Sequence, residues 1–240
     1  NNAVINDINA PLMNFYRSVQ QNFGALSEEL AGLEAIYNSN RAAFEAQKQL
    51  HPDERVEDAN ESLYYHLRDM YNGLIPAEYS DAALYFYINK IAYSGMIRYN
   101  ARGEYNVPYG RYKNFNTGMI TEAHYNLLAN TEIHNGDYGQ IFNLAMPEDF
   151  IFLDPPYDCI FSDYGNEEYR EGFNEANHRQ LAQDYFNLGC RALMVIGATP
   201  LTRELYGGHI ITEYDKNYSV NIRNRFQAEA IHLLITNYEL

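Results

Sequence analysis

Short apolar runs that alternate with helical patterns limit most strongly how this chain can fold. Phe150–Leu153, Ala192–Ala198 and Glu229–Asn237 have the length and composition of strands, and a helical pattern at Ala176–Leu188 separates the first two. Val4–Asp7 is a shorter stretch that begins apolar and ends in an acid. This alternation predicts an α/β protein with a parallel sheet and helices on both faces. Because Phe150–Leu153 is apolar throughout, we expect a central parallel strand there.

The stretch from Leu26 to about Tyr93 interrupts this alternation. Its apolar residues recur at helical spacing, most clearly in Ala82–Ile91, and we find no strand-like alternation in it. The following segment, Gly95–Lys113, is rich in Tyr, Asn, Gly and Arg, and Ala101–Glu104 has the composition of a hairpin turn. We therefore expect an inserted helical subdomain that carries a β-hairpin.

Charge and composition limit the partners. The formal net charge of −15 argues against a general nucleic-acid binder, because phosphate contacts need Lys and Arg. The segment Arg98–Lys113, however, holds four basic residues and one acid, Glu104, so a local basic surface on an acidic body is expected. The two cysteines and seven histidines show no metal-ligand spacing, so we expect no metal. With no membrane-spanning run and no secretory signal, we expect a cytoplasmic protein without a membrane partner.

The sharpest motif is Asp154-Pro155-Pro156-Tyr157, directly after an apolar strand. In a parallel sheet, ligands bind at the carboxyl ends of the strands. The motif suits chemistry on an exocyclic amino group such as that of adenine. This group is a poor nucleophile because its lone pair is delocalised into the ring. The Asp154 carboxylate and a backbone carbonyl of the Pro-Pro segment can accept its two hydrogens, and Tyr157 offers a flat face for a flipped base. The alternative is a proline-rich turn, but the strand context favours the functional interpretation.

Two further stretches share a pattern with one family. Asn6-Asp7-Ile8-Asn9 precedes a helix, and Ile97–Asn100 with Arg102–Lys113 forms the predicted hairpin. Together with the tetrapeptide, these motifs resemble those of the Dam-like DNA adenine methylases over most of the chain. The resemblance implies a Rossmann-like methyltransferase sheet, S-adenosyl-L-methionine as cofactor and adenine in double-stranded DNA as substrate. The resemblance of Arg98 and its neighbours to the family implies a GATC-like site.

The resemblance also implies a set of cofactor contacts. The acid at the Asp7 position holds the ribose hydroxyls in the family, and Asn135–Tyr138 resembles the motif that contacts the cofactor's adenine. The implied cofactor-binding residues are Asp7, Ile8, Asp137, Tyr138, Asp154 and Pro155. A helix-capping acid at Asp7 and a polar turn at Asn135–Tyr138 are the alternatives.

DNA contacts are implied for the hairpin. In the family, the residue that matches Arg98 reads a guanine, which is the commonest direct base contact of arginine. Arg111 and Lys113 are expected to hold phosphates, while Asn89 and Tyr93 are expected to help seat the hairpin. An ordinary solvated turn is the alternative. The implied DNA-binding residues are Arg98, Asn100, Asn106, Pro108, Arg111 and Lys113.

The expected domains follow from these motifs. Residues 1–24 and 116–240 are expected to form the catalytic domain, and 25–115 the helical target-recognition domain with its hairpin at 95–113. The family's first strand and its Phe-x-Gly-x-Gly loop have no counterpart here. We therefore expect an N-terminally truncated chain that a preceding segment or a separate chain complements. An exposed sheet edge and self-association would follow.

Other functions stay open at this point. A DNA-binding module without catalysis is favoured by the absent glycine loop, and an acidic α/β protein without a DNA partner by the net charge. Related tetrapeptides serve amino-cytosine, RNA adenine and protein glutamine methylation, but Asp154 and the hairpin favour adenine in duplex DNA. Tyr164, and a loop with Asn217–Val220, Arg223 and Arg225, are further candidates for DNA contact.

Overall fold

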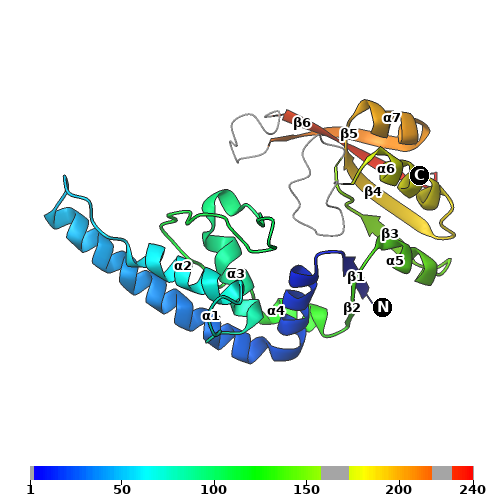
Figure 1. The fold of residues 1–240 in the computed structure, drawn as a ribbon. Coiled ribbons are helices and arrows are strands. Elements are labelled where there is room, and N and C mark those ends of the chain that lie inside the picture. Colours follow the sequence, from blue (N-terminus) through cyan, green and yellow to red (C-terminus); the bar gives the residue numbers. More distant parts are fainter. Residues whose placement is uncertain (1–2, 158–172, 218–228, 240) are drawn as a thin grey trace. The chain divides into compact units, whose positions relative to one another are not determined.

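A computed structural model gives the fold and describes residues 3–157, 173–217 and 229–239 (Figure 1). Helices and strands occur together, which confirms a mixed α/β protein. The chain divides into two compact units, Asn1–Gly136 (unit 1) and Asp137–Leu240 (unit 2). Tyr164 and the loop residues Val220, Arg223 and Arg225 lie outside the described residues.

Unit 1 is mostly helical. In chain order its elements are β1 (Ala3–Asp7), α1 (Ala10–Leu50), α2 (Ala59–Tyr71), α3 (Asp81–Ile91), the 3-10 turn η1 (Tyr93–Gly95), α4 (Glu122–Leu128) and β2 (Thr131–Asn135). The helical stretch expected after Leu26 is confirmed by the remainder of α1 together with α2 and α3. α1 bends sharply at Asn22, where φ is −135° and ψ is 30°, so two expected helices are continuous across a kink (Figure 1).

Aromatic residues fill the core of unit 1. Four fully buried tyrosines come from α1, α2, α3 and the hairpin, namely Tyr37, Tyr64, Tyr87 and Tyr105. Buried hydroxyls need hydrogen-bond partners, and three of the four have one. The Tyr37 hydroxyl donates to the Tyr112 carbonyl at 2.5 Å, and those of Tyr64 and Tyr105 donate to the Val107 and Met96 carbonyls at 2.9 and 2.7 Å. The core therefore fixes the hairpin by direct bonds as well as by packing.

β1 and β2 form a two-stranded parallel sheet in unit 1. Asp7 pairs with Asn135, so the polar residues at the two carboxyl ends lie side by side. Among the described strands, β1 pairs with β2 only. Val4 on β1 is 47% exposed. This leaves an apolar side chain at an open sheet edge.

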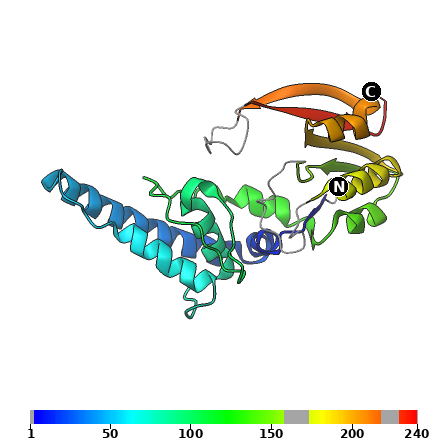
Figure 2. The ribbon, with the colours of Figure 1, turned by 45° about the horizontal axis from the view of Figure 1, so that its top comes forward.

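Unit 2 holds a four-stranded sheet in the order β3-β4-β6-β5. Its elements are α5 (Tyr138–Leu144), β3 (Phe150–Leu153), α6 (Glu175–Phe186), β4 (Arg191–Gly197), α7 (Pro200–Tyr206), the 3-10 turn η3 (Gly207–His209), β5 (Ile210–Asn217) and β6 (Glu229–Thr236). The two long strands β5 and β6 lie side by side in both views of the ribbon (Figures 1 and 2).

Two expectations for this sheet are wrong. β3 is parallel to β4 but lies at the edge of the described sheet, and Phe150 and Phe152 on it are 56% and 60% exposed. An apolar run shows that a strand can be covered on both faces, but it does not show that both edges are paired. β6 is antiparallel to both β4 and β5, so the sheet is mixed.

The hairpin of unit 1 is short. Tyr99 and Tyr105 form an antiparallel bridge, and the backbone N–H groups of Asn100 and Asn106 donate to the carbonyls of Glu104 and Arg98 at 2.9 and 3.1 Å. The expected turn therefore exists. The expected division of the chain at residues 24/25 and 115/116 stays a prediction.

Candidate active site and recognition hairpin

The Asp154–Tyr157 motif leaves β3 at its carboxyl end, as the sequence predicts. Asp154 is exposed, whereas Pro155, Pro156 and Tyr157 are half-buried. The Tyr157 hydroxyl donates to Asp154 Oδ1 at 3.4 Å. An acidic acceptor and an aromatic ring therefore lie together beyond the strand.

The Tyr157 ring is held by residues that the sequence analysis missed. It meets the edge of the His232 imidazole with 5.1 Å between ring centroids, and it lies against Gly197. Gly197 on β4 and His232 on β6 are paired across the sheet. Their contact with Tyr157 depends on strand pairing between distant parts of the chain, so no local sequence pattern predicts it.

His232 is itself fixed. It is 1% exposed, and the Tyr214 ring on β5 packs against it at a tilt of 56°, with 5.4 Å between ring centroids and the Tyr214 hydroxyl 3.5 Å from His232 Nδ1. Tyr157 thus rests on β4 and β6, and Tyr214 on β5 supports it through His232. A ring supported in this way is preorganised to stack on a planar ligand.

Asp137 and Tyr138 begin α5 in unit 2. The Asp137 carboxylate accepts the Gly139 N–H at 2.8 Å and caps the helix. The Tyr138 hydroxyl donates to Asp184 on α6 at 2.7 Å, and its ring packs edge-on against Phe142 at 5.0 Å. The Tyr138 ring therefore has a fixed orientation, whether or not a ligand contacts it.

Asp7 lies at the carboxyl end of β1 in unit 1. Its Oδ1 accepts the Asn9 N–H at 2.7 Å, and Asn9 caps α1 through the Leu12 N–H at 3.1 Å. The Asp7 carbonyl accepts from the side chain of Asn135 at 2.8 Å, and the Ile8 carbonyl from the same amide at 3.2 Å. The capping role expected as the alternative thus falls to Asn9, and Asp7 supports it.

Two acceptor atoms at the end of β1 have no donor among the described residues. None of these residues donates to Asp7 Oδ2, and the buried Asn6 Oδ1 also has no partner among them, although Asn6 Nδ2 donates to the Gly136 carbonyl at 2.9 Å. Both acceptors belong to the end of β1. The half-buried Asp7 carboxylate suits a ligand that brings hydroxyl or amino donors, whereas the Asn6 oxygen is enclosed by protein atoms.

Arg98 and Asn106 are paired on the hairpin. The Asn106 Oδ1 accepts from Arg98 Nε at 2.7 Å, and the Asn106 carbonyl accepts from Arg98 Nη2 at 3.1 Å. Arg98 is exposed and Asn106 half-buried. The guanidinium is therefore presented to solvent in a defined direction.

Asn100 closes the turn of the hairpin. Its Oδ1 accepts the N–H groups of Arg102 and Glu104 at 2.8 and 3.1 Å, and its Nδ2 donates to the Glu104 carboxylate at 2.7 Å. Gly103 has φ of 78°, a conformation that favours glycine. Asn100 thus shapes the hairpin through its own side chain.

The base of the hairpin is fastened to the end of α3. Tyr93 N–H donates to the Pro108 carbonyl at 2.9 Å, and Gly110 N–H donates to the Ile91 carbonyl at 2.8 Å. A Cβ at Gly110 would lie 2.7 Å from that carbonyl oxygen, so only glycine fits there. Pro108 itself is exposed, which leaves its ring accessible.

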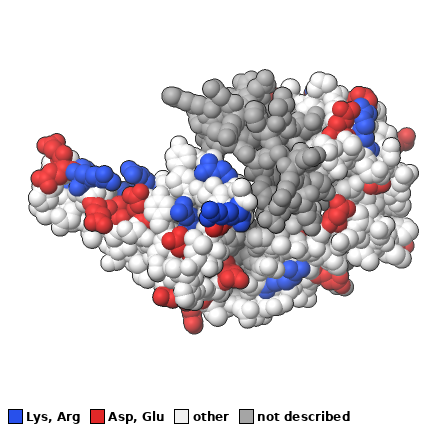
Figure 3. Space-filling view, viewed as in Figure 1, with Lys and Arg blue, Asp and Glu red and all other residues white. Residues whose placement is uncertain are grey.

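Basic side chains gather around this hairpin. Arg98, Arg102, Arg111 and Lys113 are all exposed, and Arg111 lies 3.8 Å from Glu61 on α2 in a loose ion pair. Figure 3 shows Lys and Arg side chains together over this part of unit 1, with Asp and Glu beside them. A local basic surface therefore exists on an acidic chain.

These motifs match a known family. A sequence profile of the D12 class N6 adenine-specific DNA methyltransferases matches residues 1–220. The chain belongs to this family. The D12 class acts on DNA, so the alternative of an acidic α/β protein without a DNA partner is wrong.

Individual relatives agree with the D12 assignment. The Type II methyltransferase M.CviBI of Paramecium bursaria Chlorella virus NC1A is 33% identical, and the alignment covers 99% of this chain and 82% of that protein. M.MjaIII of Methanocaldococcus jannaschii is 29% identical over 98% of this chain and 80% of its own length. The DNA adenine methylase of Salmonella typhi is 31% identical over 60% of this chain and 53% of its own length.

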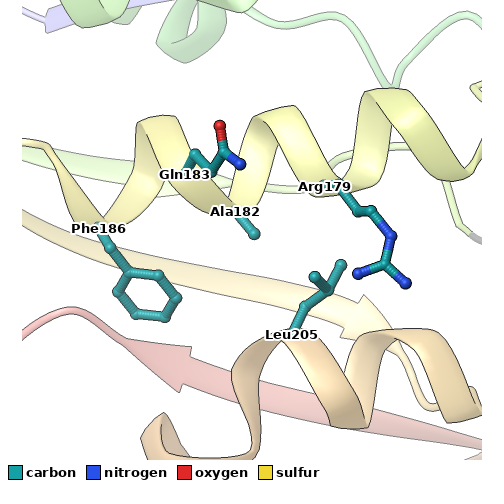
Figure 4. A pocket seen from close by; sticks show the side chains of 5 residues that line it. All are labelled: Arg179, Ala182, Gln183, Phe186 and Leu205. Carbon is teal, nitrogen blue, oxygen red and sulfur yellow. The ribbon is translucent and has the colours of Figure 1, made fainter.

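A shallow cavity of unit 2 lies away from the D12 motifs. It has a volume of about 250 Å³ between α6 and α7, and Figure 4 shows its lining of Arg179, Ala182, Gln183, Phe186 and Leu205. The guanidinium of Arg179 pairs with Glu175 and Glu204, each about 2.9 Å or less away. None of the predicted site residues lines this cavity.

Two kinds of feature are absent from the described residues. No helix there is both long and apolar enough to cross a membrane. No group of three or more His, Cys, Asp or Glu side chains there is arranged to hold a metal ion.

Proposed function

We propose that this chain transfers a methyl group from S-adenosyl-L-methionine to the exocyclic amino group of an adenine flipped out of duplex DNA, in a GATC-like site. The observation that carries the proposal is the Asp154–Tyr157 motif at the end of β3, with its ring braced by His232 and Gly197. Family membership supports the reaction class.

The catalytic residues would be Asp154, Pro155, Pro156 and Tyr157. Asp154 and a Pro carbonyl accept hydrogen bonds from the adenine amino group, which favours the tetrahedral geometry of a nucleophile. The cofactor, when bound, supplies an electrophilic methyl group on a sulfonium. On transfer, the amino nitrogen would gain this methyl group, the bond between the methyl group and the sulfur would break to leave a neutral thioether, and the nitrogen would lose one proton to solvent. Tyr157 would stack on the flipped base.

Cofactor-binding residues are proposed in each unit. In unit 1, the half-buried Asp7 carboxylate has one oxygen, Oδ2, to which no described residue donates, which suits ribose hydroxyls, and Ile8 is its neighbour. In unit 2, Tyr138 presents a ring fixed by Asp184 and Phe142, with Asp137 beside it. Asp154 and Pro155 complete the proposed set.

DNA binding is assigned to the hairpin. Arg98 would read a guanine, and Arg111 and Lys113 would hold phosphates. Asn106 orients Arg98, and Asn100 acts through the turn that it closes. Pro108 offers an exposed apolar contact.

The fold-level part of the proposal is a Rossmann-like catalytic domain from residues 1–24 and 116–240, with an inserted recognition domain at 25–115. The kink at Asn22 and the hairpin fastened to α2 and α3 support this division. We expect the reaction in the cytoplasm.

Mapping of modified bases tests the function. Unmethylated plasmid DNA is incubated with the full chain and S-adenosyl-L-methionine, and N6-methyladenine is located by single-molecule sequencing. We expect methylated adenine in GATC alone. Methylation of another motif would overturn the proposed site, and modified cytosine or no modification would overturn the proposed reaction.

Base flipping needs a separate test. A duplex that carries 2-aminopurine in place of the target adenine is titrated with the chain. We expect fluorescence to rise on binding, because unstacking relieves the quenching of this base analogue. Binding without a rise would show that the base stays stacked.

A further inference from the structure

α2 holds the hairpin backbone at Tyr105 in the way that a neighbouring strand would. Asn72, the residue that ends α2, donates from Nδ2 to the Tyr105 carbonyl at 3.0 Å, and its Oδ1 accepts the Tyr105 N–H at 2.8 Å. Both backbone groups of one hairpin residue are thus satisfied by one amide. This pair of hydrogen bonds fixes the rotation of the backbone as well as its position.

A second attachment lies two residues further along the hairpin. The Tyr64 hydroxyl donates to the Val107 carbonyl at 2.9 Å, and Arg68 Nη1 donates to the same oxygen at 3.3 Å. Tyr105 and Val107 are 1% and 0% exposed. The backbone on both sides of position 106 is therefore anchored to α2.

This anchoring directs Asn106 away from the core. Successive side chains of an extended segment point to opposite faces, so buried Tyr105 and Val107 leave Asn106 on the outer face. There, Asn106 accepts hydrogen bonds from Nε and Nη2 of Arg98, through its Oδ1 and its backbone carbonyl respectively. These two donors form the side edge of the guanidinium. The end edge, with the Nη1 protons and the remaining Nη2 proton, is left for a ligand.

The free end edge matches the acceptors of guanine. Two parallel N–H groups suit the O6 and N7 atoms that guanine presents in the major groove. We propose that Asn72 is a positioning residue for base readout: through Tyr105 it fixes the backbone that carries Asn106, and Asn106 aims Arg98 at guanine. This inference rests on the proposed role of Arg98 in DNA binding.

The ratio of two dissociation constants, that for a modified duplex over that for the unmodified duplex, separates a positioning role from a general effect on stability. The full chain is titrated with a GATC duplex and with the same duplex in which 7-deazaguanine, which lacks N7, replaces the guanine. For the native chain we expect about tenfold weaker binding to the 7-deaza duplex, because one arm of a bidentate contact is lost. In Asn72→Ala we expect this ratio to fall towards one.

Two further variants serve as a stability control and as a second test of the attachment to α2. Gln20→Ala removes two side-chain bonds to backbone carbonyls of the same unit, at Leu128 and Thr131, away from the hairpin. It should lose stability while the ratio stays native. Tyr64→Phe removes the hydroxyl that bonds to the Val107 carbonyl, keeps the ring, and should lower the ratio in part.

The outcomes are distinguishable. If Arg98→Ala lowers the ratio but Asn72→Ala and Tyr64→Phe leave it native, the positioning role is overturned and the proposed readout stands. If Arg98→Ala also leaves the ratio native, Arg98 does not read guanine and the inference falls with that assignment. If Gln20→Ala lowers the ratio as Asn72→Ala does, the effect reports general stability and the positioning role is overturned.

Discussion

At the residue scale, the chemistry of this chain depends on how a few side chains are supported. Tyr157 is half-buried, but its ring is braced by His232 and lies against Gly197. The tetrapeptide itself could be predicted from the sequence because its residue types and its place after a strand are local. The supporting residues could not, because they come from β4 and β6.

The Tyr157 ring leads to a direct prediction. Tyr157→Ala should lower methyl transfer to duplex DNA about 10- to 100-fold, because stacking of a base on an aromatic ring contributes about 1–3 kcal/mol. Tyr157→Phe keeps the ring and should retain most of the rate. Single-turnover rates of both variants give the comparison, and equal losses would assign the effect to the hydroxyl instead.

Gly110 carries a second prediction at this scale. Gly110→Ala would place a Cβ 2.7 and 2.9 Å from the Ile91 and Ala92 carbonyl oxygens. Backbone atoms cannot give way cheaply, so we expect a loss of about 1–3 kcal/mol in the free energy of unfolding, with weaker DNA binding.

Gly32→Ala is the matched control for that change. Gly32 lies within α1 and has no atom within 4 Å of an added Cβ. We expect a gain of about 0.5–1 kcal/mol, because alanine loses less entropy in a helix. Urea unfolding measures both variants, and similar losses in both would contradict the steric account.

At the element scale, helices with clear periodicity were predictable and sheet order was not. Ala82–Ile91 agrees with α3 (Asp81–Ile91) almost exactly at both ends, since a Ser80 cap and an apolar stripe are local signals. The edge position of β3 and the antiparallel direction of β6 depend on pairing partners that no local pattern names.

The hairpin, as an element, predicts a salt dependence. Arg111→Ala and Lys113→Ala should each weaken DNA binding uniformly across sequences. Each should also reduce the slope of log affinity against log salt by about one, because each would remove one of the proposed phosphate contacts. Arg41→Ala on α1, where Arg41 pairs with Glu45, is the control. An unchanged slope in both hairpin variants would remove them from the phosphate contacts.

At the scale of the whole molecule, the protein combines two compact units with tyrosine-rich cores. Burial raises the pKa of Tyr64 in unit 1 to about 12, and it also raises the pKa values of Tyr185 and Tyr206 in unit 2. The neutral forms of these side chains are thus favoured in the folded state.

This predicts the response to alkali. A phenol whose folded pKa exceeds its unfolded value of about 10 contributes full stability below pH 10 and loses it as pH rises towards 12. Each such tyrosine should lower the free energy of unfolding by about 1.4 kcal/mol per pH unit in that window. Urea unfolding at stepped pH, with tyrosinate absorbance as the second readout, measures it. A flat profile above pH 10 would contradict the burial of these hydroxyls.

The central claim is that Asp154 lies at the catalytic site of an adenine methyltransferase, and transfer of a labelled methyl group tests it most directly. The full chain, Asp154→Asn and Asp149→Asn are each incubated with tritiated S-adenosyl-L-methionine and a GATC duplex. Asp149 is a matched control, an acid at the opposite end of β3 whose side chain accepts the Met146 N–H at 2.8 Å. We predict label in adenine for the native chain and for Asp149→Asn, and none for Asp154→Asn. Label transfer that survives Asp154→Asn, or is absent from the native chain while it binds both cofactor and duplex, would contradict the account.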